Sequence, residues 1–137
     1  MSDDERPMIR VRSLDHFVLR VRDLDASLRF YRDLLGLAVE QEEAYRQGLR
    51  PFVSVRVGDQ LLDLVPDPTY DPASGPGGFL HFCITTDTDF AAVVRRLKEA
   101  GVPLLHDEPV RRGGARGEGL SIYAHDPDDY MVELKEY

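Results

Sequence analysis

The sequence predicts an α+β fold in which one strand–helix–three-strand unit of about 65 residues occurs twice. Two alignments of the chain with itself support this. At an offset of 65, residues 16–19 (HFVL) align with 81–84 (HFCI). At an offset of 70, residues 59–64 (DQLLDL) align with 129–134 (DYMVEL). Because such repeats define an architecture, we expect one domain over 1–137, with a first module at about 12–65, a linker at 66–78 and a second module at about 79–137.

The first module begins with a strand at 16–21, and an acidic turn then leads into a helix. Asp23 or Asp25 can cap this helix, because aspartate accepts hydrogen bonds from the free amides of a first helical turn. Gly36 suits the left-handed residue that ends a helix. The apolar face of the helix carries Leu28, Tyr31, Leu34 and Leu35. Three strands are expected to follow, near 38–44, at 52–57 and at 60–65.

The second module repeats this order from a strand at 81–85. Thr88 or Asp89 can cap its helix, and Gly101 corresponds to the glycine that ends the first helix. Its later strands are expected near 103–106, at 120–125 and at 130–136.

Two segments interrupt the repeat. Residues 66–78 contain four prolines and three glycines, so they predict a linker without regular structure. Residues 107–119 are Gly-rich and predict a second long loop, either a binding segment or a flexible connector.

The polar groups of the predicted strands share one face. Side chains alternate between the two faces of a strand, and in each module one face is apolar while the other carries a histidine and a carboxylate. These are His16 and Asp63, then His81 and Glu133. If the sheet curls, the equivalent positions of two repeats gather on its concave side. Two imidazoles with one or two carboxylates suit zinc, iron, nickel, cobalt or manganese, so we predict a metal site; the other two histidines lie outside the repeat.

The composition excludes several other classes of function. The net charge is −8, which disfavours binding to nucleic acid or to anionic membranes. No apolar run approaches the roughly 20 residues of a membrane span. The single cysteine excludes an internal disulfide framework, and the expected compartment is the cytoplasm.

Three segments resemble the vicinal oxygen chelate superfamily, which includes glyoxalase I, fosfomycin-resistance thiol transferases, extradiol dioxygenases, methylmalonyl-CoA epimerases and bleomycin-binding proteins. The three segments are residues 14–37, 78–102 and 125–137. The resemblance covers about 12–137, and the stretch at 111–128 is similar to a small glyoxalase-like, virulence-associated bacterial subgroup. The resemblance implies two βαβββ modules that form a curved, cup-like mixed sheet around one divalent transition metal, with the helices on the outer face of the sheet.

The resemblance also implies a ligand set. Carried over residue by residue, the family's ligands are His16, Asp63, His81 and Glu133. Asp63 departs from the pattern, because the family has glutamate or glutamine there and aspartate is one methylene shorter. Direct ligation by Asp63, ligation through a water and no ligation are therefore all open.

The resemblance implies a glyoxalase-type lyase or isomerase whose small substrate chelates the metal through vicinal oxygens. A carboxylate removes a proton beside a carbonyl and returns it to the next carbon. Glu133 is the predicted base if it is displaced from the metal, with Asp63 as the alternative. The residues expected to contact the substrate are Arg20, Arg56 and Tyr123 from the strands, and Arg112 and Arg116 from the Gly-rich loop.

Two other functions remain open. An extradiol-type dioxygenase would use His16, His81 and Glu133 as a two-histidine, one-carboxylate iron site. A non-catalytic drug- or metabolite-binding protein is disfavoured, because such members usually lack the metal ligands. The resemblance further implies a homodimer, in which the cup is formed within one chain or by exchange of modules between two.

Overall fold

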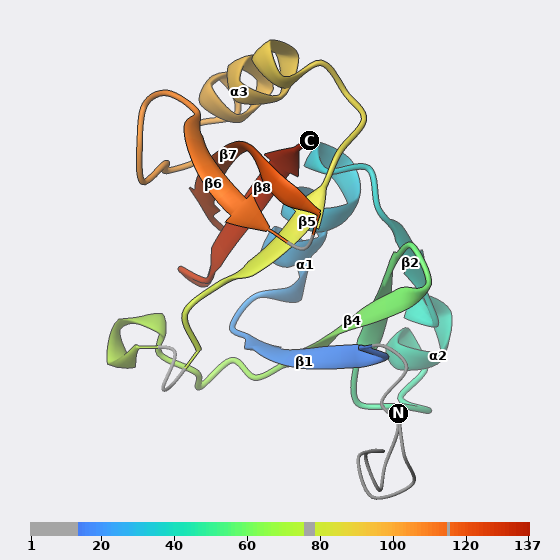
Figure 1. Ribbon diagram of the computed structural model, residues 1–137. Coiled ribbons are helices and arrows are strands. Elements are labelled where there is room, and N and C mark those ends of the chain that lie inside the picture. The colour runs from blue at the N-terminus through green and yellow to red at the C-terminus, as the bar shows by residue number, and fades with distance from the viewer. Residues whose placement is uncertain (1–13, 76–78, 115) are drawn as a thin grey trace, which may run out of the picture.

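The computed structural model describes residues 14–75, 79–114 and 116–137 (Figure 1). The first half contains β1 (His16–Val21), α1 (Leu24–Leu28), its π-helical continuation η2 (Arg29–Leu34), β2 (Ala38–Glu40), α2 (Glu42–Arg46), β3 (Val53–Val57) and β4 (Gln60–Pro66). The second half contains the 3₁₀ turn η3 (Pro72–Ser74), β5 (Phe82–Thr85), α3 (Phe90–Glu99), β6 (Val110–Gly114), β7 (Gly117–His125) and β8 (Met131–Glu136).

Each half of the chain forms its own four-stranded mixed sheet. The strand orders are β1-β4-β3-β2 and β5-β8-β7-β6. In the first sheet β1 runs parallel to β4, and in the second β5 runs parallel to β8. The registers are equivalent, since Val18 pairs with Asp63 in the first sheet and Cys83 pairs with Glu133 in the second. The predicted α+β fold with two related modules is confirmed.

The helix ends follow the local signals in the sequence. The side chain of Asp23 accepts a hydrogen bond from the Ala26 amide at the start of α1, and that of Asp89 accepts one from Ala92 at the start of α3. Gly36 and Gly101 have φ angles of 74° and 72°, a region that glycine enters without steric strain.

One apolar core joins the two modules. The apolar face of each strand packs together with the helices, as the alternation predicted. Phe17 and Phe82, which occupy equivalent positions of the two repeats, contact each other with ring centroids 4.8 Å apart. Fully buried core residues include Val21, Val53, Val55, Leu62, Ile122 and Val132.

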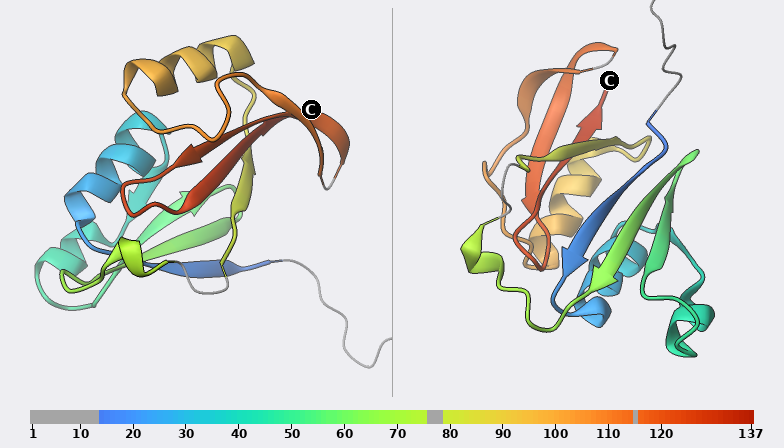
Figure 2. Two further views of the ribbon diagram at one scale, coloured as in Figure 1. Left: turned by 90° about the vertical axis from the view of Figure 1, so that its left-hand side faces the viewer. Right: turned by 90° about the horizontal axis from the view of Figure 1, so that it is seen from below.

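The turn between β7 and β8 is the main polar contact between the modules. Asp126 accepts a hydrogen bond of 2.7 Å from the hydroxyl of Tyr31, at the end of the first helix. Asp128 accepts one from the Arg22 amide, also at 2.7 Å. Figure 2 shows the first helix at one side of the molecule, where it borders both sheets. The turn therefore fixes the second sheet against the first helix.

Four expectations about individual segments were wrong. The linker 66–78 is not wholly irregular, because β4 extends to Pro66 and a 3₁₀ turn covers Pro72–Ser74; its last three residues, 76–78, lie outside the described residues. The strand near 38–44 stops at Glu40, because Gln41 has a φ of 66° and the backbone then enters α2. The segment 103–106 is not a strand and forms only an isolated bridge between Leu104 and Ala124. The Gly-rich segment 107–119 is largely a β-hairpin of β6 and the start of β7.

Two glycines of this hairpin allow close packing. A Cβ atom at Gly119 would collide with the backbone carbonyl oxygen of Glu136, and one at Gly114 would collide with the Lys135 side chain and the Tyr137 hydroxyl. Gly117 instead has a φ of 105°, a conformation that favours glycine.

No helix in the described part of the chain is both long and apolar enough to cross a membrane.

Candidate metal and substrate site

Glu133 and His81 form the best-defined part of the candidate site. Glu133 lies in the middle of β8, between β5 and β7, where it is buried. His81 directly precedes β5, and its Nε2 lies 3.2 Å from Oε1 of Glu133. Two ligands about 2.1 Å from a shared ion and at right angles to each other would be about 3 Å apart. The separation of this pair therefore fits two donors to one metal ion.

The second carboxylate oxygen of Glu133 is already bonded within the protein. The hydroxyl of Ser121 donates a 2.6 Å hydrogen bond to Oε2. The Lys135 ammonium in turn donates to Ser121 Oγ at 2.9 Å, and lies 3.6 Å from Glu133 Oε2. The alternation of β7 and β8 places the side chains of Ser121 and Lys135 on the face that carries Glu133, although the sequence pattern indicated no role for either residue.

Asp63 has a similar environment in the first module. The Ser54 hydroxyl donates a 2.6 Å hydrogen bond to Asp63 Oδ1, and the Arg50 guanidinium donates to Ser54 Oγ at 3.3 Å. Arg50 also lies over the ring of Phe52, 4.0 Å from its centroid. Asp63 is thus buried and held through one oxygen.

His16, the remaining predicted ligand, is about half exposed at the start of β1. Its Nδ1 lies 2.7 Å from a carboxylate oxygen of Asp15. This hydrogen bond raises the pKa of His16, and the charge of Asp63 adds to the shift. A carboxylate on one ring nitrogen is the usual partner of a histidine that binds metal through the other, so His16 could ligate through Nε2.

The four predicted ligands do not form one cluster within a single chain. Among the residues that the structure describes, no group of three or more histidine, cysteine, aspartate or glutamate side chains converges closely enough to hold an ion. His81 contacts Glu133, whereas the carboxylate that contacts His16 is that of its neighbour Asp15. The structure thus presents one pair of the predicted ligands in contact, and the four-ligand set stays a prediction.

One of the predicted substrate-binding residues, Tyr123, lies beside the His81–Glu133 pair. Tyr123 pairs with Glu133 across the sheet, and its ring meets that of His81 edge to face at 5.7 Å. Partial burial raises the pKa of Tyr123, and the charge of Glu133 raises it further, whereas the charge of Arg112 lowers it. His106, which the sequence gave no reason to select, also meets the Tyr123 ring, at 6.2 Å.

The other predicted arginines bind carboxylates or aromatic rings in this structure. Arg20 lies 3.5 Å from Asp67, and Arg56 makes two contacts of 2.8 and 3.1 Å with Glu40. The guanidinium of Arg116 lies 5.1 Å from the centroid of the Tyr137 ring. Their predicted role in binding a substrate is not tested by these contacts.

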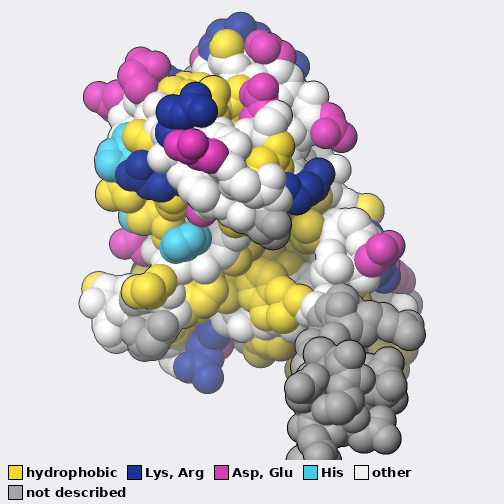
Figure 3. Space-filling model, viewed as in Figure 1, with side chains coloured by type: hydrophobic (Ala, Val, Ile, Leu, Met, Phe, Trp, Pro, Cys, Tyr) yellow, Lys and Arg dark blue, Asp and Glu magenta, His cyan; other side chains and the backbone are white. Residues whose placement is uncertain are grey.

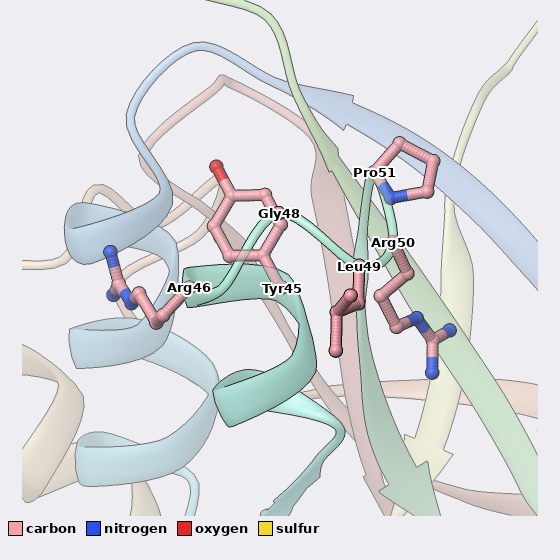
Figure 4. Close-up of a pocket in the computed structure, with 6 residues that line it drawn as sticks. All are labelled: Tyr45, Arg46, Gly48, Leu49, Arg50 and Pro51. Atoms are coloured by element: carbon pink, nitrogen blue, oxygen red, sulfur yellow. The ribbon is translucent and has the colours of Figure 1, made fainter.

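The molecular surface has a pocket whose lining includes Arg50, the residue that contacts Ser54. This pocket, of about 650 Å³, lies at the loop from α2 to β3 (Figure 4). On the face shown in Figure 3, hydrophobic side chains gather between the two sheets, and the histidine side chains in view lie on the left-hand side.

Comparison with known proteins decides the family. Residues 13–134 match the Glyoxalase/Bleomycin resistance protein/Dioxygenase superfamily. The chain belongs to this superfamily. It is 33% identical to the virulence protein STM3117 of Salmonella typhimurium, over 90% of this chain and 83% of that protein. The crystal structure of STM3117 superposes with a TM-score of 0.73, covering 94% of this chain and 99% of the other.

Relatives in the superfamily include enzymes with different reactions. The mouse mitochondrial methylmalonyl-CoA epimerase is 30% identical, over 97% of this chain and 78% of the epimerase. A lactoylglutathione lyase of Neisseria meningitidis is 28% identical, over 87% of this chain and 86% of the lyase. The superfamily is thus established for this chain, and its own reaction has to be argued from the site.

Proposed function

We propose that this protein is a metal-dependent, glyoxalase-like lyase or isomerase. Its substrate is a small molecule that presents two neighbouring oxygens to the metal. The observation that carries the proposal is the His81–Glu133 pair, in which an imidazole nitrogen and a buried carboxylate oxygen lie 3.2 Å apart. Its relatives among lyases and epimerases support the same class of chemistry.

The residues that would hold the metal are His16, Asp63, His81 and Glu133. A bound divalent ion supplies Lewis acidity that stabilises the negative charge developing on a substrate oxygen. When it is displaced from the metal, Glu133 accepts the proton from the carbon beside the substrate carbonyl through Oε1 and returns it to the next carbon. Asp63, the equivalent residue of the first module, is the alternative base.

The side chains around Glu133 orient the substrate. Tyr123 lies on the sheet beside Glu133, with its ring against His81, so its hydroxyl can hydrogen-bond a substrate oxygen. The positive charge of Arg112 acts on the Tyr123 hydroxyl and favours an anionic substrate group at the same place. These two residues define the side of the site that we assign to the substrate.

We further propose that the active form is a homodimer in which each metal is shared by two chains. All four predicted ligands belong to the described residues, in which His81 contacts Glu133 and no group of three or more such side chains converges. A second copy that places its first module against the second module of this chain would bring its His16 and Asp63 to the His81–Glu133 pair.

Metal analysis of protein purified without added metal tests the proposal. We expect about one zinc, nickel, cobalt or manganese ion per chain, together with isomerisation or lyase activity on hemithioacetals or related α-hydroxycarbonyl compounds. Iron with oxygen-dependent cleavage of catechols would instead establish a ring-cleaving dioxygenase. No bound metal, combined with no rise in Tm on addition of any of these ions, would leave a binding protein.

A further inference from the structure

The carboxylates of both modules are held by the same type of contact. In each module a serine hydroxyl donates a 2.6 Å hydrogen bond to one carboxylate oxygen, from Ser121 to Glu133 and from Ser54 to Asp63. In each module a cationic side chain donates to that serine. The cation is Lys135 in the second module and Arg50 in the first.

The cation determines the direction of the serine hydrogen bond. A serine hydroxyl has one proton to donate and lone pairs that accept. The Lys135 ammonium can only donate, so it takes a lone pair of Ser121 Oγ. The single hydroxyl proton of Ser121 then points to Oε2 of Glu133. One carboxylate oxygen is thereby occupied, and the other, Oε1, is directed to Nε2 of His81.

Lys135 is buried to an extent unusual for a lysine, with 1% of its surface exposed. Its ammonium is satisfied by Ser121, by the Arg112 carbonyl oxygen at 2.8 Å, and by the face of the Tyr137 ring. The absence of a side chain at Gly114 leaves the space that the lysine occupies. Burying an ammonium is costly unless it is paired, and this one lies 3.6 Å from Glu133 Oε2.

We propose that Ser121 and Lys135 are positioning residues that make Glu133 act through a single oxygen. They bind Oε2, so that only Oε1 is presented beside His81 as metal ligand or proton acceptor. This inference rests on the proposed function. The Arg50–Ser54 contact holds Asp63 in the same way, through a longer and more exposed hydrogen bond.

Titration of the metal-free protein with Co²⁺, followed by visible absorption, tests the assignment. The variants are Ser121→Ala, Ser121→Thr and Lys135→Met, with Lys98→Met as the matched control because Lys98 lies on the exposed side of α3. Ser121→Ala and Lys135→Met should weaken Co²⁺ binding by roughly 10–100-fold, the range seen when a hydrogen-bond partner of a metal ligand is lost. Ser121→Thr retains the hydroxyl and should restore most of the affinity. Lys98→Met should bind as the wild type does.

The absorption spectrum separates positioning from a purely structural role. Release of Oε2 lets Glu133 bind through both oxygens, which raises the coordination number and weakens the cobalt bands. A merely structural role for the Ser121–Lys135 contact would lower Tm and leave the spectrum unchanged. Folded Ser121→Ala and Lys135→Met proteins with wild-type affinity and spectrum would overturn the inference and leave the proposed function intact. If the wild-type protein bound no Co²⁺, both the proposed function and this inference would be wrong.

Discussion

The substitution Asp126→Asn should make the protein more stable at neutral pH. Asp126 lies in the β7–β8 turn, where burial raises its pKa from 3.8 to about 6, against the opposing effect of its hydrogen bonds from Tyr31 and from the amides of Asp128 and Tyr130. A carboxyl whose pKa is higher in the folded protein binds its proton more tightly there than in the unfolded chain. Its contribution to stability is therefore complete below pH 4 and is lost as the pH rises through 6.

The size of the effect follows from the shift. Two pKa units correspond to about 3 kcal/mol, and most of that difference, about 2 kcal/mol, develops between pH 4 and pH 7. Asparagine can keep the turn intact. Its carbonyl oxygen can accept from the amides of Asp128 and Tyr130, as Oδ1 does in the wild type, while its amide group faces the Tyr31 hydroxyl, which can also accept.

Chemical denaturation of the wild type and Asp126→Asn at pH 4, 5, 6 and 7 measures the prediction. The free energy of unfolding of the variant minus that of the wild type should rise by about 2 kcal/mol from pH 4 to pH 7, with its steepest change below pH 6. Asp129→Asn is the matched control, because its side chain belongs to the same turn and is exposed. A flat difference for Asp126→Asn, or an equal rise for both variants, would refute the reasoning.

Three further results are expected. His81→Ala should abolish metal uptake while His106→Ala should not, as measured by metal analysis of the purified proteins; equal losses would contradict the ligand assignment. If two chains share each metal, mixing inactive His16→Ala and His81→Ala dimers under subunit exchange should restore about one intact site per mixed dimer, whereas sites formed within single chains would stay inactive. Tyr31→Phe should destabilise the protein by about 1–3 kcal/mol in denaturation at pH 7, because it removes a buried hydrogen bond to a charged carboxylate; an unchanged midpoint would show that the Tyr31–Asp126 contact does not stabilise the module interface.

The sequence predicted the features that depend on local chemistry or on the repeat. The caps at Asp23 and Asp89 and the ends at Gly36 and Gly101 follow from short-range preferences of the backbone. The equivalent registers of Asp63 and Glu133 follow from the self-alignment. These features can be predicted without knowing how the two sheets pack.

The features that the sequence did not predict depend on side-chain contacts between paired strands. The Gly-rich segment was taken for a loop, because glycine usually marks one, but at Gly114 and Gly119 it allows close packing against β8 and the C-terminus. The contact from Lys135 through Ser121 to Glu133 spans β7 and β8, and only their register brings the three side chains together. Lysine side chains are rarely buried, so nothing in the sequence indicated that Lys135 would be.

The two modules share a scaffold but provide unequal environments for their carboxylates. Glu133 has the longer side chain, contacts a histidine and has a buried cation 3.6 Å from its second oxygen. Asp63 is one methylene shorter, and its serine is contacted by an arginine at 3.3 Å. A reaction that moves a proton between two neighbouring carbons can be carried out by one base, which takes the proton and returns it. The repeat would provide two equivalent positions around the substrate, and the differences between Glu133 and Asp63 would make only one of them the base.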